Sequence, residues 1–254
     1  MREGRSKNIL WAAFFIGALT LFIQLFQAGS IVWIPIFLLS ILLSYQFLQN
    51  NFSKIIFVLG LSFVILVQSF PKWVIFVTSL HRDFVVDEHQ NLLSLQRFLE
   101  HSLVMLTPLL LMVWPRRSFG FLSKMLISLT FVAHGLFALG LPNGTPDHFY
   151  GMLSVCLPFL GEQGAVIFLR IAGAMDIVVV VLMWTSGRWR QFALLYMSIW
   201  GFLTAFARPW SSPSAWYLSL DTIYPWLEMS QRLPHALVPF SLFHWYKEAN
   251  SYSS

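Results

Sequence analysis

Three ionisable residues interrupt long apolar stretches in the C-terminal half of the chain: His134, Arg170 and Asp176. An imidazole and a carboxylate can each transfer a proton, and both can hydrogen-bond to the oxygen atoms of a bound ligand. Where an apolar stretch crosses a membrane, an ionisable group at the bilayer centre costs about 2.5–3.5 kcal/mol and must face protein or water. These residues are therefore the first candidates for a functional site.

Helical spacing separates the two charged residues of this set. At about 100° per residue, Arg170 and Asp176 differ by about 240° around a helix, so they cannot share one narrow face. Gly173 lies about one turn from each of them and permits the close approach of another helix. We expect Asp176 to face the interior of a bundle, and Arg170 to reach outer water or meet a second acid. The interior group then forms either a structural hydrogen-bonded network or a polar pocket for a substrate or proton.

A second set of candidates comes from two segments that resemble each other. The sequence QRFLEHSLV at 96–104 matches QRLPHALV at 231–238 when a gap of one residue is allowed. The ionisable residues that this match adds to the candidates are Arg97, His101, Arg232 and His235. A haem held between the two histidines is one idea that the match raises.

The same match predicts two parallel four-helix units, at residues 1–114 and 121–246, with a short cytoplasmic tail at 247–254. Chance similarity between two amphipathic helix starts is the alternative.

Two loops on the outer side add further candidates. The loop at 208–232 runs from Arg208 to Arg232 and is rich in Trp and Tyr. Such aromatic residues normally form an anchoring belt at the membrane surface. The alternative is a lid over an outward pocket, in which Asp221 and Glu228 pair with the two arginines. The segment at 81–89 holds two His and three carboxylates, and is either a solvated loop or a metal site without a recognised ligand spacing.

The composition indicates what must hold these residues in place. Of the 254 residues, 57% are hydrophobic and 11% are charged, whereas a soluble domain usually has about a quarter of its residues charged. Long charge-free runs recur along the chain and predict an all-α, polytopic membrane helix bundle. This excludes a soluble enzyme and a nucleic-acid binder. Because Cys156 is the only cysteine, an intrachain disulfide and a thiolate metal site are excluded as well.

About eight transmembrane helices are predicted. They cover residues 9–28, 31–49, 55–79, 97–114, 121–141, 165–185, 190–207 and 233–246. The eighth is short and contains two prolines, so whether it spans fully stays open. Most basic residues fall on one side, which the positive-inside pattern assigns to the cytoplasm. The expectation is therefore a multi-pass protein of the inner (plasma) membrane, with the lipid bilayer around it and both termini cytoplasmic.

The C-terminal half resembles the DoxX-like membrane family over about residues 121–210. The motifs that carry the resemblance are His134-Gly135, the sequence LRIAGAMD at 169–176 and the sequence TAFARP at 204–209. Asp176 stands where this family commonly has Glu, and the family is typically a single four-helix unit, without a counterpart of residues 1–114. The resemblance implies a four-helix fold. For some members it implies a place in thiosulfate–quinone oxidoreductases or other membrane redox assemblies.

These observations favour a quinone-linked or redox-complex membrane subunit with an outward-facing polar pocket. His134 and Asp176 would serve the carbonyl oxygens of a quinone. The sequence has no flavin, nicotinamide or iron–sulfur motif, so a redox partner protein must supply electrons. The alternatives are a transporter or solute-binding membrane protein, and a non-catalytic scaffold or assembly factor, so whether the chain is an enzyme stays open. The expected binding residues are His134, Arg170, Asp176, Arg208, Arg97, His101, Arg232 and His235.

Overall fold

The computed structural model describes residues 6–13, 16, 96, 99–100, 102–114, 116–141, 144–145, 147–212, 215 and 223–251. Its elements are α5 (Ser102–Val113), α6 (Arg117–Leu139), α7 (Asp147–Cys156), η1 (Pro158–Leu160), α8 (Gly161–Met183), α9 (Gly187–Ser211), α10 (Tyr224–Arg232) and α11 (Pro234–Ser251). The described part contains helices and no strand, which confirms the all-α class. The predicted helices at 31–49 and 55–79, the segment at 81–89 and most of the unit at 1–114 lie outside the described residues.

The helices of the C-terminal half coincide with the predicted ones. α6 corresponds to the helix expected at 121–141, α8 to 165–185, α9 to 190–207 and α11 to 233–246. α6 ends at Gly140, whose backbone adopts the left-handed conformation with φ 82°. Glycine adopts this conformation without steric cost. The backbone N–H groups of Gly140 and Leu141 donate to the last carbonyls of the helix, with N···O distances of 3.0 and 2.9 Å.

Two helices lie where none was predicted, one of them within the predicted loop at 208–232, which corrects the sequence analysis. The loop at 208–232 contains α10, and the connection between α6 and α8 contains α7. Both helices begin with recognisable signals: α7 has Asp147 in its first turn, and α10 has Pro225 near its start. Because the Trp and Tyr residues of this loop suggested a surface belt, the amphipathic pattern of α10 was not recognised as a helix.

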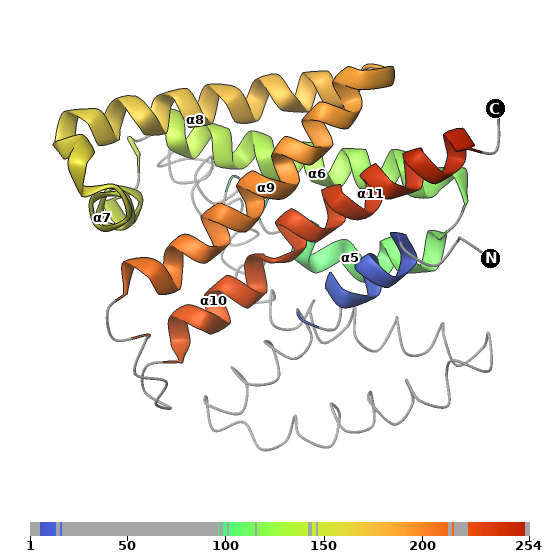
Figure 1. Cartoon of the computed structure of the whole chain (residues 1–254), viewed down its shortest axis with the longest axis horizontal. Coiled ribbons are helices and arrows are strands. Elements are labelled where there is room, and N and C mark those ends of the chain that lie inside the picture. The colour runs from blue at the N-terminus through green and yellow to red at the C-terminus, as the bar shows by residue number, and fades with distance from the viewer. Residues whose placement is uncertain are drawn as a thin grey trace, which may run out of the picture.

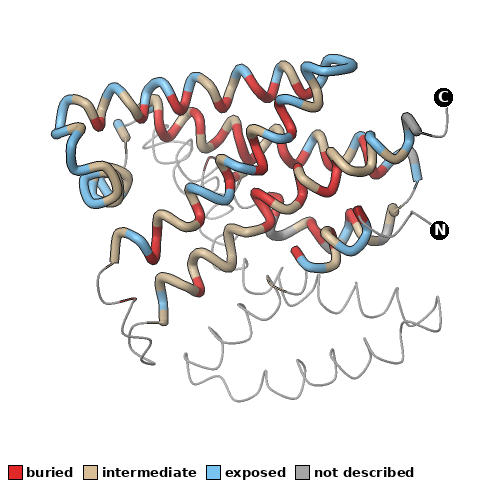
Figure 2. Tube along the Cα trace, viewed as in Figure 1, coloured by how far each residue is buried: buried red, intermediate tan, exposed pale blue. Residues whose placement is uncertain are grey.

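The described helices form one bundle (Figure 1). α6 packs against α8, α9 packs against α8 and α11, and α5 packs against α6 and α11. Buried residues lie on the sides of the helices that face one another, as Figure 2 shows. The apolar core gathers around α6 and α9, and its largest fully buried side chains include Phe119, Ile127, Leu194 and Met197.

The first described helical residues join this bundle next to its last helix. The hydroxyl of Ser241 in α11 donates to the carbonyl oxygen of Ser6 at 2.8 Å, and the Ser6 hydroxyl donates to Glu248 at 2.8 Å. The segment that begins at Ser6 therefore lies beside α11 in the bundle.

Two helical stretches in the described part are long and apolar enough to cross a membrane: Ser118–Leu139 and Pro158–Met183. In addition, large apolar side chains are exposed along α8 and α9, a surface that suits contact with lipid better than with water. These side chains include Ile167, Ile171, Val178, Val181, Phe192, Leu195, Ile199, Phe202 and Leu203. The eight spans and the orientation of the termini stay predictions.

Candidate functional site

The site lies beside a crossing at which two helices touch through their backbones. A Cβ atom built on Gly135 of α6 would lie 2.8 Å from the carbonyl oxygen of Gly173 in α8, and one built on Gly173 would lie 2.6 Å from that of Gly135. Only glycine fits at such a contact. The same built atom on Gly135 would lie 3.4 Å from Cβ of Asp176, so the crossing brings Asp176 close to the backbone beside His134. The predicted close approach at Gly173 is confirmed.

A second close crossing joins α9 to α11. A Cβ atom built on Gly201 would lie 2.7 Å from the carbonyl oxygen of His235. This contact sets the position of Trp200, the residue before Gly201, relative to His235. The two crossings therefore hold side chains from four helices around one space.

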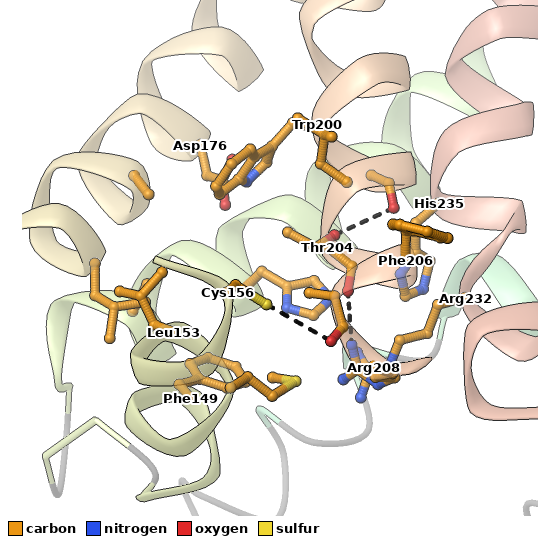
Figure 3. A pocket seen from close by; sticks show the side chains of 18 of the residues that line it. Phe149, Leu153, Cys156, Asp176, Trp200, Thr204, Phe206, Arg208, Arg232 and His235 are labelled. Carbon is orange, nitrogen blue, oxygen red and sulfur yellow. Dashed lines mark hydrogen bonds between the residues drawn. The ribbon is translucent and has the colours of Figure 1, made fainter. Parts of the chain in front are cut away.

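That space is a cavity of about 350 Å³ (Figure 3). Its apolar wall consists of Phe131, Ala138, Phe149, Met152, Leu153, Leu157, Phe168, Leu169, Ala172, Gly201, Leu203, Phe206, Ala207 and Trp210. Residues with polar atoms complete it: His134, Cys156, Asp176, Trp200, Thr204, Arg208, Arg232 and His235. A mainly apolar and aromatic wall with a few polar groups is typical of sites for small organic ligands.

Asp176 and Trp200 form one end of the cavity, which we call the carboxylate end. Asp176 is only 4% exposed, and the Trp200 side chain hydrogen-bonds to it. Figure 3 shows the two side chains next to each other. The second carboxylate oxygen, Oδ1, is buried and has no hydrogen-bond partner among the described residues. A buried polar atom of this kind normally has a partner, so Oδ1 is the natural contact for a ligand atom.

Two ion pairs form the other end of the cavity, which we call the ion-pair end. Nη1 of Arg232 lies 2.6 Å from Oε1 of Glu100, and Nε of Arg208 lies 3.8 Å from Oε2 of Glu228. Nη1 of Arg208 also donates to the carbonyl oxygen of Thr204 at 2.9 Å. Each guanidinium at this end therefore has a carboxylate partner.

The histidine pair, His134 and His235, connects the two ends. Their rings meet edge to face, with centroids 5.3 Å apart. Nε2 of His134 lies 3.7 Å from Oε1 of Glu100, the same oxygen that contacts Arg232. His134 thus contacts the ion-pair end, while the residue that follows it touches the helix of Asp176.

His148 of α7 lies near the ion-pair end without lining the cavity. The residue as a whole is exposed, but partial desolvation of its ring lowers the pKa of His148 below its ordinary value. The charges of Arg208 and Arg232 lower this pKa further, while Glu100 and Glu228 act in the opposite direction. The field of the two arginines therefore extends to the surface of α7.

The structure brings five of the eight predicted binding residues together. His134, Asp176, Arg208, Arg232 and His235 all line the cavity. Arg170 is exposed on the outer face of α8 and does not line it, as the 240° separation from Asp176 predicts. Arg97 and His101 lie outside the described residues. The predicted pairing of Glu228 with an arginine is found at Arg208.

Sequence reasoning missed three contributors: Glu100, Trp200 and Thr204. Glu100 belongs to the segment that matches residues 231–238, but nothing in the match indicates that its carboxylate pairs with Arg232 of the other copy. Trp200 and Thr204 lie on the face of α9 that also carries Arg208, at spacings of eight and four residues. A helical-wheel reading of 200–208 would have found that face.

A scan of protein-family models and searches of curated proteins and solved structures found no match to this chain. The resemblance to the DoxX-like family stays a prediction that rests on its short motifs.

Proposed function

We propose that the chain is a multi-pass inner-membrane protein that binds a quinone-type ligand in the cavity, as a membrane subunit of a redox system. The observation that carries the proposal is Asp176, which lines an aromatic-walled cavity together with His134 and His235 and whose buried Oδ1 lacks a partner in the described part. The eight spans, the cytoplasmic termini and the DoxX-like character of residues 121–210 belong to this proposal.

The charges around the cavity favour a neutral ligand. At the ion-pair end, the guanidinium groups of Arg208 and Arg232 already have carboxylate partners, so an anionic ligand would have to displace one of them. A carboxylic acid can donate to a quinone carbonyl, and a carboxylate can accept from a quinol hydroxyl. Asp176 can therefore serve either redox form.

The walls and the outer surface support a ligand that reaches the site from lipid. Phe131, Phe168 and Phe206 offer aromatic faces to a planar ring. The exposed apolar faces of α8 and α9 are suited to hydrocarbon, in which long-tailed quinones dissolve.

The redox chemistry assigned to the site is proton handling. When a quinol becomes a quinone it loses two electrons and two protons. We assign the electrons to a one-electron carrier in a partner protein, and the protons to Asp176 and His134.

Calorimetry in lipid nanodiscs tests this function. The probe is a ubiquinone analogue with a short tail, whose fully substituted ring cannot react with thiols, and protein-free nanodiscs are the blank. We expect saturable binding that Asp176→Asn weakens at least tenfold. Asp147→Asn, which changes an exposed acid outside the cavity, should leave the affinity unchanged.

Cys156 provides an independent readout, because it is the only cysteine and lines the cavity. Burial raises the pKa of the Cys156 thiol, so alkylation should be measured at mildly alkaline pH. Bound quinone should slow the alkylation. If the wild type shows neither binding nor protection, the quinone proposal is wrong. Cavity variants that then lower only stability would indicate a scaffold.

A solute transporter is the second candidate. It is favoured by ionisable groups of both signs at two ends of one cavity, as a polar solute with two charged groups would require. Uptake of radiolabelled amino acids into proteoliposomes, abolished by Asp176→Asn and not by Asp147→Asn, would support this candidate over the first.

A further inference from the structure

Glu100 and Arg232 form a shielded ion pair between parts of the chain that lie 132 residues apart. Their side chains are 9% and 19% exposed, and Nη1 and Oε1 are 2.6 Å apart. Removing two charges from water costs more than a loose pair returns, so such a pair is weak as a pure stabilising device. Its position beside the cavity indicates a second role.

The geometry shows which group the pair acts on. Oε1 of Glu100 contacts both Arg232 and Nε2 of His134, at 2.6 and 3.7 Å. Arg232 fixes this oxygen, and the oxygen faces a ring that lines the cavity. A negative charge within 4 Å of an imidazole stabilises the protonated ring.

Other ionisable groups line the cavity beside His134 or lie near its ion-pair end. They are Asp176 on α8, Arg208 on α9, Glu228 and Arg232 on α10, His235 on α11 and His148 on α7. Glu228 lies against Arg208, so those two charges largely compensate each other. Arg232 likewise offsets part of the charge of Glu100, but Glu100 is the carboxylate that lies 3.7 Å from Nε2 of His134.

We propose that Glu100, held in place by Arg232, makes His134 the group that exchanges a proton with the cavity ligand. The inference rests on the proposed quinone-type function and assigns the proton acceptor of that site. In the step, the O–H bond of one quinol hydroxyl breaks and an N–H bond forms on His134, while the proton of the other hydroxyl passes to the Asp176 carboxylate and the two electrons leave one at a time. The imidazolium is then paired with the Glu100 carboxylate, and the electrons leave for the partner protein's carrier. Glu100 and Arg232 are positioning residues.

This assignment gives the binding of oxidised quinone a pH dependence with a definite sign. Imidazolium donates a hydrogen bond to the quinone carbonyl, whereas neutral imidazole favours a quinol hydroxyl. Affinity for the quinone is therefore high below the pKa of His134 and falls as pH rises through it. A mutation that removes the charge of Glu100 moves the midpoint of this fall in affinity to lower pH.

The experiment measures the Kd of the short-tailed ubiquinone analogue from pH 5 to 9 in nanodiscs. The main variant is Glu100→Gln, which removes the negative charge beside His134 and keeps a hydrogen-bond acceptor for Arg232. We expect its midpoint to fall by about one pH unit, as the loss of a nearby charge shifts a pKa by 1–3 units. Arg232→Gln should raise the midpoint, and His134→Asn should abolish the pH dependence.

Asp147→Asn is the control, because it neutralises an exposed carboxylate outside the cavity and should leave the midpoint in place. Folding of each variant is checked by gel filtration and circular dichroism. If quinone binds but neither folded Glu100→Gln nor folded Arg232→Gln differs from the wild type in its midpoint, this inference is wrong and the quinone function stands. If the wild type binds no quinone at any pH, both are wrong.

Discussion

The two ends of the cavity differ in how their charges are compensated. At the ion-pair end, Arg208 and Arg232 each meet a carboxylate of the same chain. At the carboxylate end, Asp176 has the Trp200 side chain as a hydrogen-bond partner, and its Oδ1 has none among the described residues. The ion-pair end is complete in the folded chain, whereas we propose that a ligand completes the carboxylate end.

This difference predicts that mutations at the two ends have different consequences. Changes at the ion-pair end should mainly alter stability and the proton affinity of His134. Changes at the carboxylate end should mainly alter binding. Four measurements on detergent-solubilised or nanodisc-embedded protein can break or sharpen that contrast.

The largest effect is expected from Glu100→Ala, which leaves the guanidinium of Arg232 buried without its partner. Breaking such a pair costs about 3–5 kcal/mol of unfolding free energy. Glu228→Ala should cost less than about 1 kcal/mol, because its side chain is 39% exposed and its contact is 3.8 Å long. Unfolding curves in denaturant compare the two variants. Equal losses would mean that the two ion pairs do not differ.

Gly173→Ala should come next, because the new methyl group would meet the backbone of α6. Overpacking of this kind costs about 1–3 kcal/mol. Both ends of the cavity should be affected, since the crossing positions Asp176 and His134. Gly151→Ala is the control: its new Cβ meets nothing within 4 Å, and alanine favours α7. A Gly173→Ala protein as stable as the wild type would contradict the close crossing.

Asp176→Asn should change unfolding free energy by less than about 1 kcal/mol while it weakens quinone binding. Asparagine keeps the shape of the side chain and can still accept a hydrogen bond from Trp200. Thermal unfolding without quinone reports the stability of the variant, and the rise in Tm on adding quinone reports binding. The two can be separated because a ligand raises the Tm only of a protein that binds it. A large loss of stability without ligand would show that Asp176 serves the fold.

The smallest effect concerns pH. Because the pKa of His148 is lowered in the folded protein, the unfolded chain binds more protons near this pKa. Above the unfolded pKa of about 6.5, His148 is neutral in both states and has no effect on the unfolding free energy. As pH falls below this value, protonation of His148 in the unfolded chain lowers the unfolding free energy. Tm of the wild type should therefore fall between about pH 6.5 and pH 5 slightly more than Tm of His148→Gln. Parallel curves for the two proteins would contradict the influence of the ion-pair end on α7.

Much of the carboxylate end could be predicted from the sequence. A charged residue within an apolar helix must be shielded, and the angle between Arg170 and Asp176 decides which of them is buried. Gly173 indicated the close crossing because glycine lacks a side chain. These are properties of one helix, and one helix can be read from its own sequence.

The ion-pair end could be predicted only in part. Its partners come from segments far apart, and Glu100 at a helix start gives no sign that Arg232 lies beside it. Helices α7 and α10 were missed for a related reason: they are short, and helices of this length depend on tertiary contacts for their stability. Glu228 was expected to meet an arginine because both residues belong to one predicted loop.

None of the ten residues of α7 is buried, yet Phe149, Met152, Leu153 and Cys156 form one wall of the cavity. The opposite walls are held by the close backbone contacts at Gly135, Gly173 and Gly201. A ligand would therefore enter and leave the cavity by displacing α7. Its residence time should depend on that helix, whereas selectivity for the ligand should depend on the two close helix crossings. Tightening α7 would slow exchange in both directions and leave the equilibrium almost unchanged.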